Sequence, residues 1–397
     1  MSQIDFDALL RLLSFTPAEP MLFNSGLFLV LFLLFSAGYA LLSAQRAKAV
    51  RLLYVTAFSY YFYYKNAGAW CCLLAVITLV NYFCALRLDH TERPAARKAW
   101  LWLAVGFMLG QLAVFKYTDF AIGTWCDLTG EPRPDTPALP VLVGISFFTF
   151  QSMSYIIDVY RRQMPATRSL TDFAFFVSFF PTLLAGPILR ARTFLPQLAK
   201  PLCVTQQMLG TGTWFIIVGL FKKCVISDYI SVNFVSRIFD NPALYSGLEN
   251  LLGIYGYALQ LYCDFSGYSD MAIGIALWMG FEIPANFRAP YKSDSITDFW
   301  RRWHISLSSW LRDYLYISLG GNRKGRLRMY FNLFLTMLLG GLWHGASWNF
   351  VIWGSVHGFA LGVHKRFREL LGHDRHYQSR GIRRFFAVLL TFHLVCF

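Results

Sequence analysis

The sequence predicts an all-α polytopic integral membrane protein with roughly ten transmembrane helices, supplemented by re-entrant or interfacial helices. Two observations lead to this class. The 397-residue chain is 56% hydrophobic and only 15% charged, with a mean hydropathy of +0.43, whereas soluble domains carry about 25% charged residues. The few charges also lie between long apolar runs, and several of these runs reach the roughly 20 residues that a spanning helix needs.

The apolar runs set the expected number of helices. Uncharged runs suited to spanning helices lie at 21–45, 66–86, 99–115, 136–157, 173–189, 201–221 and 329–343, and shorter ones, suited to tilted or re-entrant helices, lie at 52–64, 250–263 and 271–281. No linker, low-complexity tract or internal repeat divides the chain, so we expect one membrane domain over 1–397. A final apolar run begins at Phe385 and stops after thirteen residues. Either the last helix is partial or the native chain continues.

The net charge of +14 is distributed as a membrane protein requires. Cytoplasmic loops of membrane proteins carry an excess of Lys and Arg. Basic clusters follow alternate apolar runs, near 46–51, 87–98 and 161–168, whereas the segment 116–135 is acidic. This alternation predicts a cytoplasmic side for the basic loops and an external N-terminus. The charge therefore belongs to the membrane surface, with lipids as neighbours, and not to a nucleic-acid interface.

No motif for a metal or a bound cofactor is present. The eight cysteines have no metal-like or redox spacing and are expected to be free thiols that pack as small hydrophobes. The glycine-rich basic segment Gly320 to Arg326 lacks the Gly-Lys-Ser/Thr of a phosphate-binding loop. It either cradles the phosphates of a coenzyme at the cytoplasmic face or is simply a basic loop. We expect no metal and no bound cofactor.

The first candidate catalytic residue is His304. It lies in the stretch 286–326, which mixes charges with tryptophan and leucine and cannot be an ordinary spanning helix. Trp300, His304 and Ser308 recur at i, i+4 and would share one face of a helix. An interfacial amphipathic helix, with its arginines on lipid phosphates, is the alternative explanation for the arginines. His304 itself is set among apolar neighbours, which favours a functional role.

The second candidate is His344. It lies between two apolar runs that are flanked by basic clusters at 323–328 and 365–368, so we expect a hairpin with His344 near its turn. At 1.5 Å per residue, His344 would lie up to roughly 24 Å from the inner surface. Gly340, Gly341 and Gly345 would let backbones approach closely and would let the helix break. An ionisable side chain at such depth is costly and indicates function.

Other polar residues give weaker indications. Asp264 and Asp270 lie between two apolar runs and would need partners, for which nearby arginines or histidines are candidates. Functional and structural readings of this pair stay open. We treat His357 and His364 as bystanders, although His357 could line the same cavity as His344.

The motifs resemble those of the membrane-bound O-acyltransferase family. The resemblance covers the chain from about Val141 onward and rests on FWRRWHISLSSWLRDYLYISLGGNRKG, MLLGGLWHGASW, LQLYCDFSGYSDMAIG and FFPTLLAGPILR. Within the family, these segments are most similar to the branch that O-acetylates secreted polysaccharides such as alginate. The resemblance implies a central tunnel between a cytoplasmic donor and an extracytoplasmic acceptor. It also implies His344 as the catalytic base, with His304 as the second motif histidine.

The resemblance therefore implies an O-acetyltransferase of the bacterial inner membrane, with acetyl-CoA as the acyl donor. The hydroxyl acceptor would belong to a periplasmic acetyltransferase-like or esterase-like partner. His344 would take the hydroxyl proton, and His304 would orient the substrate or stabilise the oxyanion. One alternative is the sister branch, which transfers D-alanine from a carrier protein. The other is a transporter or flippase, although the paired halves typical of transporters are absent from the sequence.

Overall fold

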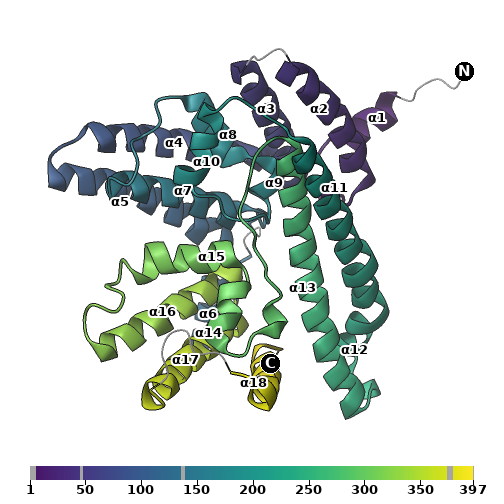
Figure 1. Ribbon diagram of the computed structural model, residues 1–397, viewed down its shortest axis with the longest axis vertical. Coiled ribbons are helices and arrows are strands. Elements are labelled where there is room, and N and C mark those ends of the chain that lie inside the picture. The colour runs from purple at the N-terminus through teal and green to yellow at the C-terminus, as the bar shows by residue number, and fades with distance from the viewer. Residues whose placement is uncertain (1–5, 45–47, 136–138, 373–378, 397) are drawn as a thin grey trace, which may run out of the picture. The chain divides into compact units, whose positions relative to one another are not determined.

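The computed structural model describes residues 6–44, 48–135, 139–372 and 379–396, and every regular element in these ranges is helical (Figure 1). The prediction of an all-α chain is confirmed. Arg46, which belongs to the first basic cluster of the topology prediction, lies outside the described residues.

The chain forms two compact units. One unit comprises Met1–Ile216 and Met271–Ile283, and the other comprises Ile217–Asp270 and Pro284–Phe397. Each unit is described by itself. The expectation of one domain over 1–397 stays a prediction.

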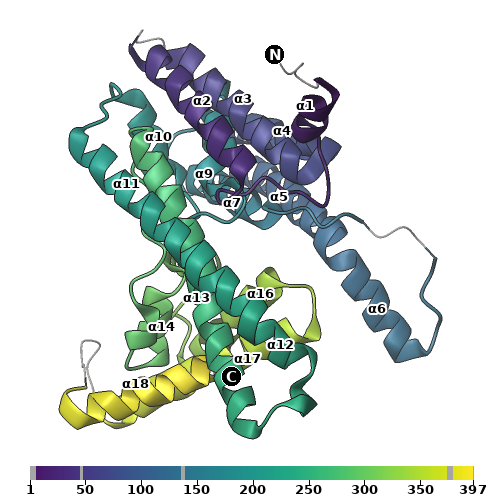
Figure 2. The ribbon, with the colours of Figure 1, turned by 90° about the vertical axis from the view of Figure 1, so that its right-hand side faces the viewer.

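The first unit is a bundle of apolar helices around a phenylalanine core (Figures 1 and 2). The ring centroid of Phe180 lies within 6.4 Å of those of six other phenylalanines, Phe28, Phe32, Phe35, Phe58, Phe62 and Phe179. Its helices are α1 (Phe6–Leu13), α2 (Gly26–Ala44), α3 (Lys48–Ala67), α4 (Cys71–His90), α5 (Pro94–Leu112), α6 (Thr118–Thr129), α7 (Ile145–Tyr160), α8 (Leu170–Ser178), α9 (Phe180–Leu183), α10 (Ala191–Ala199) and most of α11 (Gln206–Leu220).

Three helical stretches in the described part of the chain are long and apolar enough to cross a membrane. They are Gly26–Ser43, Lys48–His90 and Pro94–Thr129, and only 22%, 39% and 28% of their most apolar windows are buried inside the protein. Most of these apolar side chains therefore face outward, as lipid-facing side chains do. The remaining helices are shorter, more polar or interrupted, so the expected number of about ten spans stays a prediction.

The second unit carries the motif histidines. It begins with a π-helical segment, η3 (Phe221–Asp228), and continues through a second π-helical segment, η4 (Ser231–Val235), and α12 (Ser236–Asp240). The long helix α13 (Gly247–Trp278) contributes its residues up to Asp270. The remaining elements are η5 (Pro242–Leu244), η6 (Pro290–Lys292), α14 (Ile296–Arg302), α15 (Ile305–Trp310), η7 (Leu311–Tyr316), α16 (Arg326–His344), α17 (Trp348–Leu370) and α18 (Gly381–Cys396).

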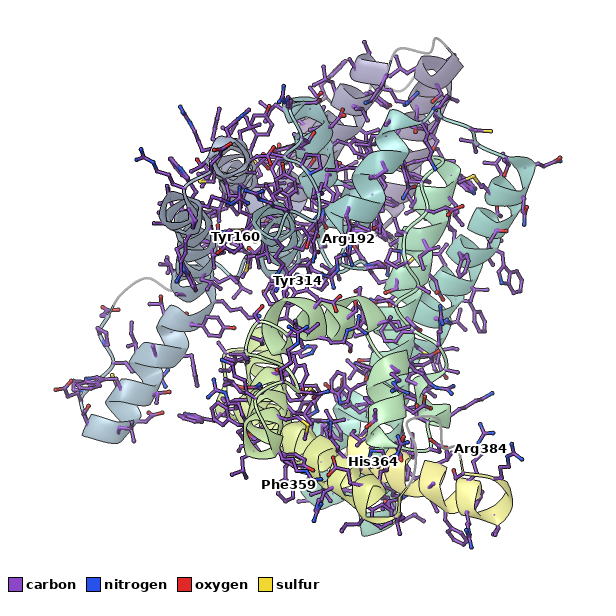
Figure 3. The ribbon with its side chains drawn as sticks, turned by 60° about the vertical axis from the view of Figure 1, so that its left-hand side comes forward. Tyr160, Arg192, Tyr314, Phe359, His364 and Arg384 are labelled. Atoms are coloured by element: carbon purple, nitrogen blue, oxygen red, sulfur yellow. The ribbon has the colours of Figure 1, made fainter. Side chains whose placement is uncertain are left out.

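Helices α16 and α17 form the hairpin that the sequence predicts. The Tyr330 hydroxyl near the start of α16 donates to Glu369 at the end of α17, so the two basic ends meet. A Cβ on Gly341 would lie 2.3 Å from the Phe350 carbonyl oxygen, and only glycine permits this approach. Gly345 is extended and ends α16 directly after His344. On the outer face of the hairpin Phe359 is 70% exposed (Figure 3).

The expected single helix through Trp300, His304 and Ser308 is wrong. The helix stops at Arg302 and a new one begins at Ile305, with His304 between them in the left-handed region (φ 44°). The helix breaks because backbone groups of this stretch form hydrogen bonds with the preceding loop instead of with the next helical turn. The Arg288 N–H donates to the Arg302 carbonyl (3.0 Å), and the Ile305 N–H donates to the Asn286 carbonyl (2.9 Å).

Candidate active site

His304 is held rigidly in the core of the second unit. Its side chain is fully buried, and its Nδ1 lies 3.1 Å from Asn286 Oδ1. The Phe265 ring of α13 packs edge-on against the imidazole, with ring centroids 4.7 Å apart. A left-handed backbone costs a non-glycine residue of the order of 1–3 kcal/mol, and such strain clusters at functional sites. Complete burial holds the pKa of His304 well below its usual range, and the nearby His344 lowers it further.

His344 lies beside His304, although 40 positions separate them in the sequence. Their ring centroids are 6.3 Å apart. His344 is half-buried at the end of α16, where Trp343 and Trp353 pack edge-on against its ring at 5.0 and 5.3 Å. The break at Gly345 places the imidazole at the end of the helix, clear of the next turn. The structure thus brings together the two histidines that the sequence singles out.

An aromatic layer connects this pair to a third histidine. His357, on α17, is buried and accepts a hydrogen bond from Trp300 Nε1 (3.3 Å). The Trp353 ring lies 4.5 Å from His357 and 5.3 Å from His344, measured between centroids. His357 is therefore buried in the wall behind His344.

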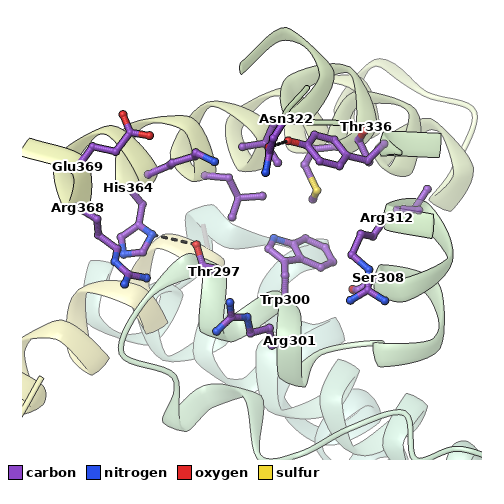
Figure 4. A pocket seen from close by; sticks show the side chains of 16 residues that line it. Thr297, Trp300, Arg301, Ser308, Arg312, Asn322, Thr336, His364, Arg368 and Glu369 are labelled. Atoms are coloured by element: carbon purple, nitrogen blue, oxygen red, sulfur yellow. Dashed lines mark hydrogen bonds between the residues drawn. The ribbon is translucent and has the colours of Figure 1, made fainter. Parts of the chain in front are cut away.

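A cavity of about 610 Å³ lies on the other side of this layer (Figure 4). Trp300 lines it, whereas neither His304 nor His344 does. Figure 4 shows Trp300 between Arg312 on one side and Arg368 on the other. The charged side chains in the wall are predominantly basic: Arg301, Arg312, Lys365 and Arg368 against Glu369.

One feature shows that the cavity suits an anion. Arg368 Nη2 is buried and has no hydrogen-bond partner among the described residues. A buried guanidinium nitrogen without an acceptor is costly, and a bound anion would satisfy it. His364 also belongs to the wall, where its Nδ1 lies 2.9 Å from the Thr297 hydroxyl. The expectation that His364 takes no part in the chemistry stays a prediction.

Asp264 and Asp270 pair with lysines, not with the arginines or histidines expected from the sequence. Lys222 contacts Asp270 at 2.6 Å, and Lys223 contacts Asp264 at 2.6 Å and Asp228 at 2.8 Å. Both lysines lie on the π-helical segment η3, which runs against α13. Gly267 makes this contact possible, because a Cβ there would lie 2.8 Å from the Gly219 carbonyl oxygen. This network supports the structural reading of the two carboxylates.

A family model for the membrane-bound O-acyltransferases matches residues 142–394. The chain belongs to this family. It is 47% identical to a probable alginate O-acetylase of Pseudomonas putida over 354 residues, which cover 87% of this chain and 71% of that protein. It is 38% identical to a peptidoglycan O-acetyltransferase of Helicobacter pylori, with 87% and 71% covered. It is also 33% identical to a teichoic acid D-alanyltransferase of Bacillus subtilis, with 67% and 70% covered.

Membership makes this chain a membrane-bound O-acyltransferase, and both motif histidines lie within the matched region. The sequence did not predict that these basic residues line one cavity. From the sequence, lipid phosphates were one explanation for Arg301 and Arg312, and Lys365 and Arg368 belonged to a basic cluster that flanks the predicted hairpin. No sequence pattern indicates that they lie together, because they come from three separate elements, α14, η7 and α17. The segment Gly320 to Arg326, for which a cradle for coenzyme phosphates is one of two predicted roles, contributes Asn322 to the cavity wall but none of its basic residues. Its contact with the donor stays a prediction.

Proposed function

We propose that this O-acyltransferase moves an acetyl group from cytoplasmic acetyl-CoA to a hydroxyl on the periplasmic side, for O-acetylation of an exopolysaccharide such as alginate. The observation that supports this most directly is the pair of imidazoles 6.3 Å apart, separated from a basic cavity by one aromatic layer. The likeness to probable alginate O-acetylases, at 45–47% identity, supports the acetyl group and the polysaccharide.

The chemistry needs one base. The acceptor hydroxyl oxygen attacks the thioester carbonyl while His344 takes its proton, and the tetrahedral intermediate then collapses with cleavage of the carbon–sulfur bond. The thiolate leaves and recovers the proton from His344. The base must be neutral to start, and Trp343 and Trp353 pack edge-on against its ring. An acyl-imidazole at His344 is the covalent variant of this scheme.

The cavity is proposed as the donor site. Its volume lies within the range of ligand pockets. Arg301, Arg312, Lys365 and Arg368 would bind the phosphates of coenzyme A, and the pantetheine arm would pass Trp300 to reach the histidines. In the proposed topology, about ten spans enclose a tunnel in the bacterial inner membrane, and this cavity opens to the cytoplasm. A periplasmic acetyltransferase-like or esterase-like protein would carry the acceptor hydroxyl.

Two donors test the phosphate site. Arg368→Gln should raise the KM for acetyl-CoA about tenfold, because one charge-assisted hydrogen bond is lost. The KM for acetyl-pantetheine, which has no nucleotide phosphates, should stay unchanged. Arg384→Gln is the matched control, since Arg384 is an exposed arginine of α18 and does not line the cavity (Figure 3). Equal effects of Arg368→Gln on both donors would contradict the assignment.

The second candidate function is transfer of D-alanine from a carrier protein, which the 33% identity to a teichoic acid D-alanyltransferase favours. Both donors would present a phosphopantetheine thioester, so the cavity alone is compatible with either. Reconstituted vesicles offered acetyl-CoA or a D-alanyl-loaded carrier protein separate the two. Thiol release with acetyl-CoA alone supports the acetyltransferase, and release with the carrier alone would replace it.

A further inference from the structure

Asn286 makes a set of hydrogen bonds that decides which nitrogen of His304 carries the proton. Its Oδ1 accepts from the Ser306 backbone N–H at 3.2 Å and from the Ser306 hydroxyl at 2.9 Å. The same oxygen lies 3.1 Å from His304 Nδ1. Its Nδ2 donates to the Ser269 hydroxyl of α13 at 3.3 Å. Asn286 is 1% exposed and His304 fully buried, so water does not compete for these bonds.

The Ser306 backbone N–H fixes the orientation of the amide. A backbone N–H can only donate, so the Asn286 atom that faces it must be the oxygen and not the nitrogen. An amide oxygen can only accept, so His304 Nδ1 must carry a hydrogen to make its bond. In a neutral imidazole, the other nitrogen, Nε2, then has a lone pair and no hydrogen.

The surroundings of His304 favour this neutral form. His344 of α16 is the titratable side chain that packs beside the imidazole. Phe265 of α13, Phe287 of the preceding loop and Trp343 of α16 also pack against the ring, and none of these three carries a charge. Complete burial disfavours the imidazolium.

We propose that Asn286 is a positioning residue that fixes His304 as the Nδ1–H tautomer, so that Nε2 accepts a hydrogen bond during the reaction. This inference rests on the proposed function. A neutral His304 of this tautomer cannot donate to an oxyanion, which removes one of the two roles considered for it. When His344 takes the hydroxyl proton, it becomes an imidazolium, and this imidazolium is the hydrogen-bond donor beside His304. The Nε2 lone pair stabilises that positive charge, and other groups stabilise the oxyanion.

Nitrogen NMR of the full-length protein with labelled histidine reads the tautomer directly. We expect the His304 Nδ1 resonance to be of the protonated type and the Nε2 resonance of the unprotonated type, with the assignment made by loss of the signals in His304→Gln. Ser269→Ala and Asn332→Leu are controls. The first removes only the partner of Asn286 Nδ2, and the second removes another buried asparagine, which bonds backbone carbonyls at Leu319 and Gly321. Both should leave the tautomer unchanged.

Two Asn286 variants test the consequence for catalysis. Asn286→Leu should lower kcat about 10- to 100-fold with little change in KM, because the imidazole loses the partner that orients it. Asn286→Asp preserves an acceptor, so it should retain the tautomer and most of the activity at high pH. Its negative charge favours the His304 imidazolium, so the acid limb of the kcat profile should move up by about one pH unit or more.

The outcomes separate this inference from the proposed function. A bare Nδ1 or a doubly protonated His304 in the wild-type protein would overturn the inference, whatever the enzyme's donor or acceptor. The inference would also be overturned if the dependence of kcat on pH were unchanged in Asn286→Asp, or if only its alkaline limb moved. If instead His344→Gln retains full activity while the His304 tautomer is as expected, the proposed function fails and the tautomer assignment stands.

Discussion

Replacement of His344 by glutamine should abolish most of the transfer activity and leave the fold nearly intact. A general base in a buried site contributes about 10²- to 10⁴-fold to the rate. This factor corresponds to about 2.7–5.4 kcal/mol of the activation barrier. Glutamine retains the length of the side chain but has no basic nitrogen at neutral pH, so kcat should fall by this factor in the His344→Gln protein.

The structural cost of the same change is smaller. His344 is half-buried and ends α16, and its ring contacts include those with Trp343, Phe350, Trp353 and His304. Edge-on ring contacts contribute about 0.5–1.5 kcal/mol each, and glutamine retains part of this packing. A loss of about 1 kcal/mol in unfolding free energy cannot change turnover per folded molecule by 10²-fold. Activity and stability should therefore separate.

The assay measures radiolabelled acetyl transfer and the thermal unfolding midpoint on the same purified samples. His357→Leu is the matched control from the same hairpin. It leaves Trp300 Nε1 without its acceptor, which costs about 1–3 kcal/mol of stability. It removes no group of the proposed chemistry, so the surviving molecules should turn over. The reasoning fails if His344→Gln accumulates normally and transfers acetyl at the wild-type rate, or if the two variants lose stability and activity in parallel.

Three further predictions concern other parts of the chain. His304→Ala should reduce kcat at least 10²-fold with normal membrane insertion, and a folded variant with full turnover would demote His304 to a packing residue. Lys222→Ala should destabilise the protein by on the order of 2 kcal/mol, because it leaves the partly buried Asp270 unpaired. A Lys222→Met, Asp270→Leu double variant should recover most of this loss. A double variant as unstable as the single one would argue against a simple ion pair. In a cysteine-free background, Arg326→Cys should react with impermeant thiol reagents only from the cytoplasmic side and Asp127→Cys only from the periplasmic side. Labelling of Arg326→Cys from the periplasm would reverse the topology.

Motifs of short range could be predicted from the sequence, and contacts across the fold could not. The hairpin of α16 and α17 follows from two apolar runs with basic ends, and the close helix contact follows from the glycines between them. The break at His304 was missed because a helical spacing of Trp300, His304 and Ser308 is only a local signal. Asn286 and Arg288, in the loop before the helix, supply the backbone bonds that end it, and Asn286 also contacts the His304 ring.

The sequence by itself determined the class of this protein, its family and the two histidines, because hydropathy and motif spacing are properties of the linear chain. Only the tertiary structure placed His304 and His344 6.3 Å apart, paired Asp264 and Asp270 with two lysines, and gathered basic residues of α14, η7 and α17 around one cavity. The proposed tautomer of His304 also depends on the tertiary structure, because it requires the contact with Asn286. The physical reason is that packing and hydrogen-bond geometry join residues across loops, and no pattern within a single helix encodes such distances.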